Sequence, residues 1–470
     1  MISIIDKIRN ISLNEPNKTA YVVGKDKITY KYLYQKANTY ASYLKKQDSK
    51  PIILYGDKEI EMIISIIACL ISNRPYIPIG TCTPKERIEK IIKLSNASLI
   101  ITKRKIDIED IEIKKIEDLI EYNQKDDITY KNDIAYIIST SGSTGEPKCV
   151  PISISNLENF TNWISKLNPL KKYKNKRVLN QASFSFDLSV ADIYYSLYNG
   201  HTLVTEDKSS CSFLTSNNIF AEEKINIAVM TPTYMKLCLV DDSFNEKTCP
   251  DFECVYFCGE QLEPSLVKKI YKSFPNLKII NAYGPTEATS AISAILITKE
   301  MCKDKILPVG EIDNLASNVE IIEEEIVIKG NSVFNGYLGN VVGGYYQENN
   351  INCYKTGDIG YIENKKIYCI GRKDSQIKYK GYRIELNDIE YNLKLIDGVD
   401  DAAVVAKYNE NNIVKTIKAY VVSNKETNYI KEKLGKKIPS YMMPKTIVLI
   451  DKLPLNQNGK IDRKALQELW

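Results

Sequence analysis

The stretch that decides the fold reads Ser139-Thr140-Ser141-Gly142-Ser143-Thr144-Gly145-Glu146-Pro147-Lys148. It follows the apolar run Ile134-Ala135-Tyr136-Ile137-Ile138, which is typical of a buried strand. Glycines let backbone N–H groups turn toward a ligand, the hydroxyls add donors, and Lys148 adds a positive charge. The loop lacks the Gly-Lys-Ser/Thr of a Walker A motif. A strand followed by this loop indicates a phosphate site, and a flexible Ser/Gly loop is the plainer alternative.

Apolar strands and amphipathic helices alternate ahead of this loop. The pattern predicts a short strand followed by a helix within 28–45, and further helices over 59–72 and 84–94. It predicts strands over 52–56, 75–79 and 99–102. Such alternation favours an α/β fold with a parallel sheet covered on both faces. Ligands of these folds bind at the carboxyl ends of the strands, where the 139–148 loop is expected to lie.

Asp187 stands between two apolar residues, Phe186 and Leu188, just before a predicted helix. A buried carboxylate costs several kcal/mol unless a cation or hydrogen-bond donor meets it. One interpretation is a helix N-cap, a position that Asp fills well. The other is a carboxylate that awaits a substrate ammonium group. The residues alone leave both interpretations open.

Three further segments carry polar groups after apolar runs. Tyr283-Gly284-Pro285-Thr286-Glu287 offers a flat ring for a purine and a carboxylate for the Mg²⁺ of ATP, or is simply a Gly-Pro turn. Asp358 lies in a short turn, and Lys460 lies in an Asn/Gly-rich tail. By themselves, the last two are an ordinary surface Asp and a solvated Lys.

Composition narrows the possible classes. A chain of 470 residues predicts at least two domains. Its 64 Lys and Arg and 59 Asp and Glu are interleaved, which argues against a nucleic-acid partner. The single histidine, His201, argues against a multi-histidine metal site and a Ser-His-Asp triad. The eleven cysteines lack paired metal spacing and predict reduced thiols. Without a signal-peptide pattern or a long apolar run, a cytoplasmic protein with no membrane insertion is expected.

In their order from about residue 28 to residue 465, these blocks resemble the adenylate-forming superfamily of acyl-CoA synthetases, luciferases and peptide-synthetase adenylation domains. The sequence around Asp187, Cys258 and Tyr283 is similar to that of the D-alanine–D-alanyl carrier protein ligases of that superfamily. The resemblance implies a large N-terminal α/β domain over 1–373, with mixed sheets and flanking helices. It also implies a small, mobile α+β domain over 374–470, hinged at Asp374.

The same resemblance implies roles for single residues. It implies catalytic roles for Lys460, Glu287 and Thr140, with Glu287 binding Mg²⁺. It implies that ATP is held by Ser139, Thr140, Ser141, Gly142, Ser143, Thr144, Gly145, Lys148, Asn281, Ala282, Tyr283, Gly284, Thr286, Asp358, Arg372 and Lys460. It implies an amino-acid pocket formed by Asp187, Leu188, Ala191, Val229, Cys258, Ala282, Ser290 and Ala291, with Tyr256 nearby.

The implied activity is ATP-dependent activation of a small amino acid, foremost D-alanine, and its transfer to the phosphopantetheine thiol of a carrier protein. The enzyme is expected to act as a monomer. Ala191 and Ser290 depart from the D-alanine ligases and enlarge or polarise the pocket, and Cys149 replaces a usual glycine. Two alternatives stay open: a stand-alone peptide-synthetase adenylation domain for another small amino acid, and, further off, an acyl-CoA synthetase.

Overall fold

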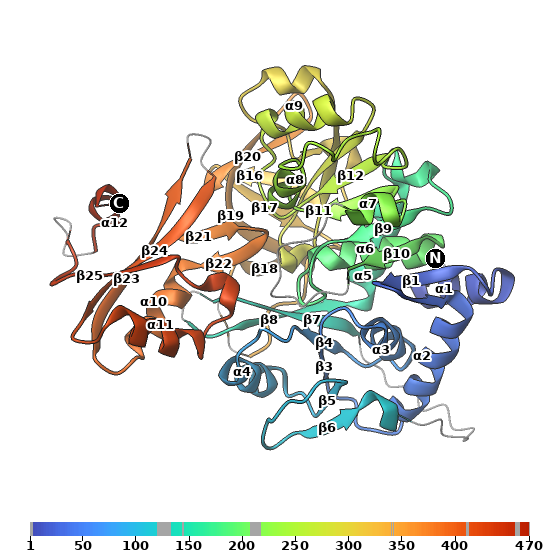
Figure 1. Cartoon of the computed structure of the whole chain (residues 1–470), viewed down its shortest axis with the longest axis horizontal. Coiled ribbons are helices and arrows are strands. Elements are labelled where there is room, and N and C mark those ends of the chain that lie inside the picture. Colours follow the sequence, from blue (N-terminus) through green and yellow to red (C-terminus); the bar gives the residue numbers. More distant parts are fainter. Residues whose placement is uncertain are drawn as a thin grey trace.

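The protein is described here by a computed structural model that covers residues 3–119, 133–142, 145–206, 218–339, 341, 343–409, 413–455 and 461–469 (Figure 1). Within these ranges the strands form five sheets. Three sheets belong to the chain before Asp374, and two small ones follow it.

The largest sheet has eight strands, and its central members run parallel. In spatial order they are β14 (Ser293–Ile297), β13 (Lys278–Tyr283), β12 (Cys254–Phe257), β11 (Ile227–Met230), β9 (Arg177–Asn180), β10 (Thr202–Thr205), β1 (Thr19–Val23) and β2 (Asp26–Thr29). Only the edge pairs with β14 and β2 are antiparallel. The carboxyl ends of β11, β12 and β13 therefore meet at one edge, where the predicted site residues follow.

A second sheet of six strands carries the 139–148 loop. Its order is β6 (Glu112–Lys115), β5 (Leu99–Thr102), β3 (Ile52–Tyr55), β4 (Tyr76–Ile79), β7 (Ile134–Thr140) and β8 (Lys148–Ser153). The third sheet contains β15 (Gly310–Glu311), β20 (Lys366–Arg372), β19 (Ile351–Glu363), β17 (Glu325–Lys329) and β16 (Asn318–Ile322), with β18 (Tyr345–Glu348) paired to β19. Asp358 lies on β19.

Helices fill the space between the sheets and cover their outer faces. One continuous apolar core joins strands of all three sheets to α1 (Ile4–Asn14), α2 (Tyr30–Leu44), α3 (Ile60–Ile71), α5 (Ile154–Lys166) and α6 (Leu188–Asn199). The far face of the eight-stranded sheet packs against α7 (Asn218–Glu222), α8 (Pro232–Cys238) and α9 (Pro264–Ser273). The far face of the six-stranded sheet packs against α4 (Lys85–Ser95).

The chain after Asp374 forms its own smaller unit, at the left of Figure 1. A hairpin of β21 (Gln376–Tyr379) and β22 (Tyr382–Glu385) precedes a sheet of β23 (Val399–Tyr408), β24 (Val414–Ser423) and β25 (Thr446–Leu449). The helices of this unit are α10 (Leu386–Lys394), α11 (Thr427–Gly435) and α12 (Arg463–Glu468). Its main apolar core is formed by buried side chains between Ile377 and Met442. Among the described residues, Phe186 is the one partly buried side chain of the earlier chain that packs on it.

The predicted α/β class, with large N-terminal sheets and a smaller C-terminal α+β unit, is confirmed. The predicted strands over 52–56, 75–79 and 99–102 match β3, β4 and β5. The boundary between 373 and 374 stays a prediction. Within the described ranges, the ten cysteines are free thiols, and none of the helices is long and apolar enough to cross a membrane.

Candidate active site

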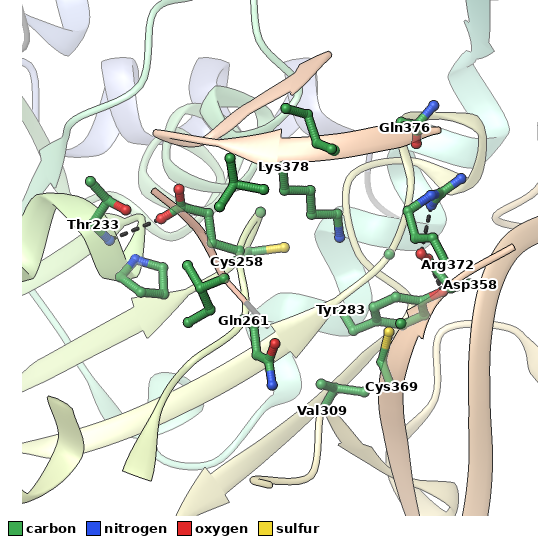
Figure 2. Close-up of a pocket in the computed structure, with 18 of the residues that line it drawn as sticks. Thr233, Cys258, Gln261, Tyr283, Val309, Asp358, Cys369, Arg372, Gln376 and Lys378 are labelled. Atoms are coloured by element: carbon green, nitrogen blue, oxygen red, sulfur yellow. Dashed lines mark hydrogen bonds and ion pairs between the residues drawn. The ribbon is translucent and has the colours of Figure 1, made fainter. Parts of the chain in front are cut away.

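Two cavities open at the carboxyl edge of the eight-stranded sheet, beneath the β21–β22 hairpin. The larger, of about 250 Å³, is lined by Tyr283, Asp358 and Arg372, among others (Figure 2). The smaller, of about 60 Å³, is lined by Asp187 and Cys258 and by the start of the 139–148 loop. Their sizes suit two different ligands: a nucleoside in the first and a group of a few heavy atoms in the second.

The larger cavity contains a connected set of ring, acid and cation. The Tyr283 hydroxyl donates to Asp358 Oδ2 at 2.7 Å, and Arg372 Nη1 donates to Asp358 Oδ1 at 2.6 Å. The Lys378 ammonium lies 5.6 Å from the centre of the Tyr283 ring. Figure 2 shows the Lys378 side chain directed toward Tyr283, with Arg372 and Asp358 beside the ring. The arrangement leaves an aromatic face and a fixed carboxylate beside each other, a combination that suits a base and a ribose.

Asp374 extends this network to the predicted hinge. Arg372 donates to both of its carboxylate oxygens, at 2.7 and 2.8 Å. Burial alone would raise the pKa of Asp374, but the hydrogen bonds and charge of Arg372 outweigh it and hold that pKa below its usual range. A bidentate guanidinium–carboxylate pair therefore fixes the chain direction where the small unit begins.

The 139–148 loop joins β7 to β8 by a tight turn at one wall of the smaller cavity. A side chain at Gly142 would place its first carbon 2.1 Å from the Glu146 carbonyl oxygen, so this position requires glycine. Ser139, Thr140 and Ser141 line the cavity, whereas Lys148 lies 5.3 Å from the centre of the Tyr337 ring. The predicted residues Ser143 and Thr144 lie outside the described residues.

Asp187 precedes α6, but its side chain makes no capping hydrogen bond. Instead the Thr286 hydroxyl donates to Asp187 Oδ2 at 2.5 Å, and the carboxylate is partly exposed to the smaller cavity. Desolvation by the surrounding protein raises the pKa of Asp187, and the Thr286 hydrogen bond and the Arg383 charge oppose the rise only in part. The site thus holds a poorly solvated carboxylate that a bound cation would stabilise.

Glu287 is fully buried and already paired. Arg383, on the hairpin, donates to Glu287 Oε2, and the Tyr337 hydroxyl donates to Oε1 at 2.6 Å. Burial raises the pKa of Glu287, but the charge and hydrogen bond of Arg383 outweigh it, so the net pKa lies below its usual range. Within the described residues no group of three His, Cys, Asp or Glu side chains could hold a metal ion. The Mg²⁺ that accompanies ATP commonly takes one or two carboxylates, so Glu287 fits that ion only when Arg383 is elsewhere.

The predicted amino-acid pocket divides into a lining and a supporting layer. Leu188, Cys258 and Ser290 line the smaller cavity with Asp187, and Ala282 lines the larger. Ala191, Val229 and Ala291 are buried in the core and line neither cavity. Asn281, predicted at the nucleotide, instead donates from its side chain to the Pro308 carbonyl oxygen at 2.8 Å.

The sequence did not predict that the β21–β22 hairpin contributes side chains to the site. Lys378, Gln376 and Arg383 reach the cavities from it, and the Gly381 N–H donates to Glu260 Oε1 at 2.7 Å. Gly381 adopts a left-handed backbone (φ +81°) against Thr231, which explains a glycine at this tip. The basic, glycine-containing block over 376–386 was the available signal, and it reads equally well as a linker.

Lys460, the predicted catalytic lysine, lies outside the described residues. The nearest described residues on either side, Leu455 and Ile461, form an isolated antiparallel bridge, and α12 follows. Helix α12 packs on β23, and its Arg463 pairs with Glu390 of α10. Figure 1 shows α12 at the outer edge of the molecule, on the side away from β11 and β12.

Comparison with known families gives two matches. The family described as AMP-binding enzyme matches residues 9–338, and the one described as AMP-binding enzyme C-terminal domain matches residues 388–460. The chain is 36% identical to the D-alanine–D-alanyl carrier protein ligase of Bacillus licheniformis and 34% identical to that of Bacillus cytotoxicus. Each alignment covers 99% of both chains.

Solved structures with the same fold include the Vibrio cholerae adenylation domain AlmE in complex with glycyl-adenosine-5′-phosphate. It aligns with a TM-score of 0.84 and 22% identity, covering 99% of this chain and 96% of that one. The o-succinylbenzoate CoA synthetase of Bacillus subtilis aligns with a TM-score of 0.83 and 18% identity, covering 98% of both chains. At these identities the structures establish a shared fold.

Proposed function

The chain belongs to the AMP-binding enzyme family, and we propose that it activates a small amino acid with ATP and transfers it to a carrier protein. The products of the first step are an aminoacyl-adenylate and pyrophosphate. The acceptor in the second step is the phosphopantetheine thiol of the carrier. The curated relatives that align over their full length are D-alanine–D-alanyl carrier protein ligases, so D-alanine is the foremost candidate substrate.

The observation that carries this proposal is the Asp187 carboxylate. It lies at the smaller cavity and accepts a hydrogen bond from Thr286, and no cationic side chain of the described residues donates to it. A fatty or aryl acid offers nothing to neutralise such a group, whereas the ammonium of an amino acid does. Recognition of the ammonium at Asp187 would direct the substrate carboxylate back toward the nucleotide cavity.

ATP would occupy the larger cavity and the 139–148 loop. Its adenine would stack on Tyr283, its ribose hydroxyls would donate to Asp358, and its outer phosphates would meet the N–H and hydroxyl groups of the loop. Glu287 would hold the Mg²⁺ of the nucleotide, which would offset phosphate charge during the reaction.

In the first half-reaction, a carboxylate oxygen of the amino acid attacks the α-phosphorus, and pyrophosphate leaves. Both reactants are anionic, so alignment and positive charge dominate catalysis, and we assign the aligning charge to Lys460. In the second half-reaction, the carrier thiolate attacks the acyl carbon, and AMP leaves. We assign the change between the two to rotation of residues 374–470 about Asp374.

The ion pair between Glu287 and Arg383 supports the assignment of the two half-reactions to two positions of residues 374–470. With Arg383 on Glu287, the carboxylate is neutralised and unavailable to a metal ion. This arrangement therefore suits the second half-reaction, in which pyrophosphate has already left. The first half-reaction requires the hairpin to withdraw, so that Glu287 is free for the metal ion.

One observation favours a second candidate, a stand-alone peptide-synthetase adenylation domain for another small amino acid. Ser290 lines the cavity where a purely apolar wall would suit a methyl group best. An acyl-CoA synthetase is the third candidate, and Asp187 argues against it.

ATP–pyrophosphate exchange tests the proposal. Exchange that depends on an amino acid, and that Asp187→Ala lowers by at least about 100-fold, is the expected result, because a buried charge pair is lost. The matched control is Asp242→Ala, which removes an exposed carboxylate beyond α8. A carrier protein and free CoA are then compared as acceptors. Equal exchange with a fatty acid, or equal transfer to CoA, contradicts the proposal.

A further inference from the structure

The Ser290 hydroxyl, in the wall of the smaller cavity, is buried and has no hydrogen-bond partner among the described residues. The residue is 3% exposed. The Thr140 hydroxyl in the same wall is likewise unpaired, but it belongs to the loop proposed to hold phosphate. Folded proteins leave few buried polar groups unpaired, because each loses its hydrogen bonds to water without compensation. An unpaired hydroxyl in a cavity wall points to a ligand that supplies the missing partner.

Ser290 lies in the wall of the cavity itself, together with Asp187 and Cys258. Its backbone is left-handed (φ +70°), as is that of Thr289 (φ +60°), a conformation that costs energy in residues other than glycine. The Cys258 thiol donates to the Ser290 carbonyl oxygen at 3.8 Å. Two strained residues therefore present the Ser290 side chain beside Cys258, at the end of β12.

Two tyrosine hydroxyls in the shared core also have no partner among the described residues, but neither residue lines the cavity. Tyr256 lies on β12, two residues before Cys258, in the core that also contains Ala191 and Val229. Tyr136 lies on β7. A substrate side chain in the cavity therefore meets Ser290 and not the tyrosines.

We propose that the amino acid activated here carries a hydrogen-bonding group on its side chain, serine being the smallest example. The inference rests on the proposed function, because it takes Asp187 as the site of the α-ammonium. A methyl side chain would fill part of the cavity and leave the Ser290 hydroxyl unpaired. A side-chain hydroxyl gives it a partner, and a cavity of about 60 Å³ limits the ligand to a small one.

The test compares serine with 2-aminobutyrate and alanine, both enantiomers of each, in ATP–pyrophosphate exchange. Serine and 2-aminobutyrate have side chains of the same heavy-atom count, so their ratio isolates the hydroxyl. We expect kcat/KM for one enantiomer of serine to exceed that for 2-aminobutyrate and alanine at least tenfold, a difference of about 1.4 kcal/mol. Ser290→Ala is expected to lower that ratio severalfold.

The matched controls remove unpaired buried hydroxyls elsewhere: Ser65→Ala on α3 and Tyr420→Phe on β24. Neither is expected to change the ratio. Alanine or 2-aminobutyrate activated as well as serine, with Ser290→Ala leaving the ratio unchanged, overturns the inference and leaves the proposed function standing. Absence of exchange with every amino acid overturns the proposed function itself.

Discussion

The large N-terminal sheets and the C-terminal unit are held by different kinds of interaction. Three sheets and five helices before residue 374 share one continuous apolar core. The C-terminal unit meets them through a polar seam, defined here as Ser141, Glu260 and Glu287 on one side and Gly381, Arg383 and Glu385 on the other. Its apolar part is one aromatic contact, Phe186 against Tyr382 and Tyr441.

This difference indicates which part of the molecule can move relative to the rest. Removing an apolar core from its partner exposes surface that water solvates poorly, whereas hydrogen bonds and ion pairs of a polar seam can be exchanged for water. Interfaces between domains that move are generally of the second kind. The hairpin and α12 lie at opposite ends of the C-terminal unit. One rotation of this unit could therefore move the hairpin away from the cavities and bring the chain next to α12 toward them.

The largest effect is expected from the proposed catalytic lysine. Lys460→Ala should lower ATP–pyrophosphate exchange at least about 1,000-fold, because alignment of two anionic reactants depends on it. Thioester formation from a chemically synthesised aminoacyl-adenylate should change less than about tenfold. Lys464→Ala, which removes an exposed lysine of α12, is the control. Equal losses of rate in both half-reactions would contradict the proposal that Lys460 acts mainly in the first.

Stability should distinguish the core from the seam. Ile67 on α3 is fully buried in the shared core, and Ile67→Ala should lower the free energy of unfolding by about 2–5 kcal/mol. Ser141 exchanges two hydrogen bonds of 3.1 Å with the hairpin, and Ser141→Ala should cost only about 0.5–1.5 kcal/mol. Urea denaturation measures both. A seam variant as costly as the core variant would mean that the unit is not built to detach.

The ion pair of the seam should matter for one half-reaction more than for the other. Arg383→Ala removes the cation from buried Glu287 and should slow thioester formation by about 30-fold or more, as loss of one partner of a buried pair does. Exchange should fall less, because Glu287 must be released for that step. Lys415→Ala, at an exposed position on β24, is the control. The opposite ranking of the two half-reactions would be incompatible with this assignment.

The smallest effect is a pH dependence. Because burial raises the pKa of Asp187, the carboxyl becomes protonated at a higher pH than an exposed Asp does and then no longer pairs with an ammonium. As pH falls through that pKa, KM for the amino acid should rise by up to about tenfold per unit, and Asp187→Asn should remove the dependence. For folding the sign is reversed: the raised pKa stabilises the protonated form, a contribution lost as pH rises. A KM that is insensitive to acid would contradict the role of Asp187.

Much of the fold was predictable, because strand and helix periodicity and the glycine-rich loop are local signals. The strands β3, β4 and β5 and the turn that needs Gly142 follow from such patterns. Asp187 could be singled out because an acidic residue between two apolar residues usually has a structural or functional role. Periodicity alone could not tell a helix cap from a cleft carboxylate, since that depends on Thr286, 99 residues away.

The seam was beyond prediction for a related reason. Arg383 and Glu287 are 96 residues apart, and the basic block around Gly381 has the composition of a linker. Likewise, Ala191 and Val229 look like pocket residues in a linear pattern, yet they lie in the layer behind the cavity wall. Contacts between distant segments decide such cases, and one sequence does not contain them.

The most direct test of the account is a distance between the two units during the reaction. Fluorophores introduced through unnatural amino acids at Val240, exposed beyond α8, and at Glu468, exposed on α12, would report it by energy transfer. We predict one distance for the enzyme with a stable aminoacyl-adenylate analogue and pantetheine thiol, and a clearly different one with ATP, Mg²⁺ and the amino acid. A single unchanged distance in an enzyme that catalyses both half-reactions would contradict the account.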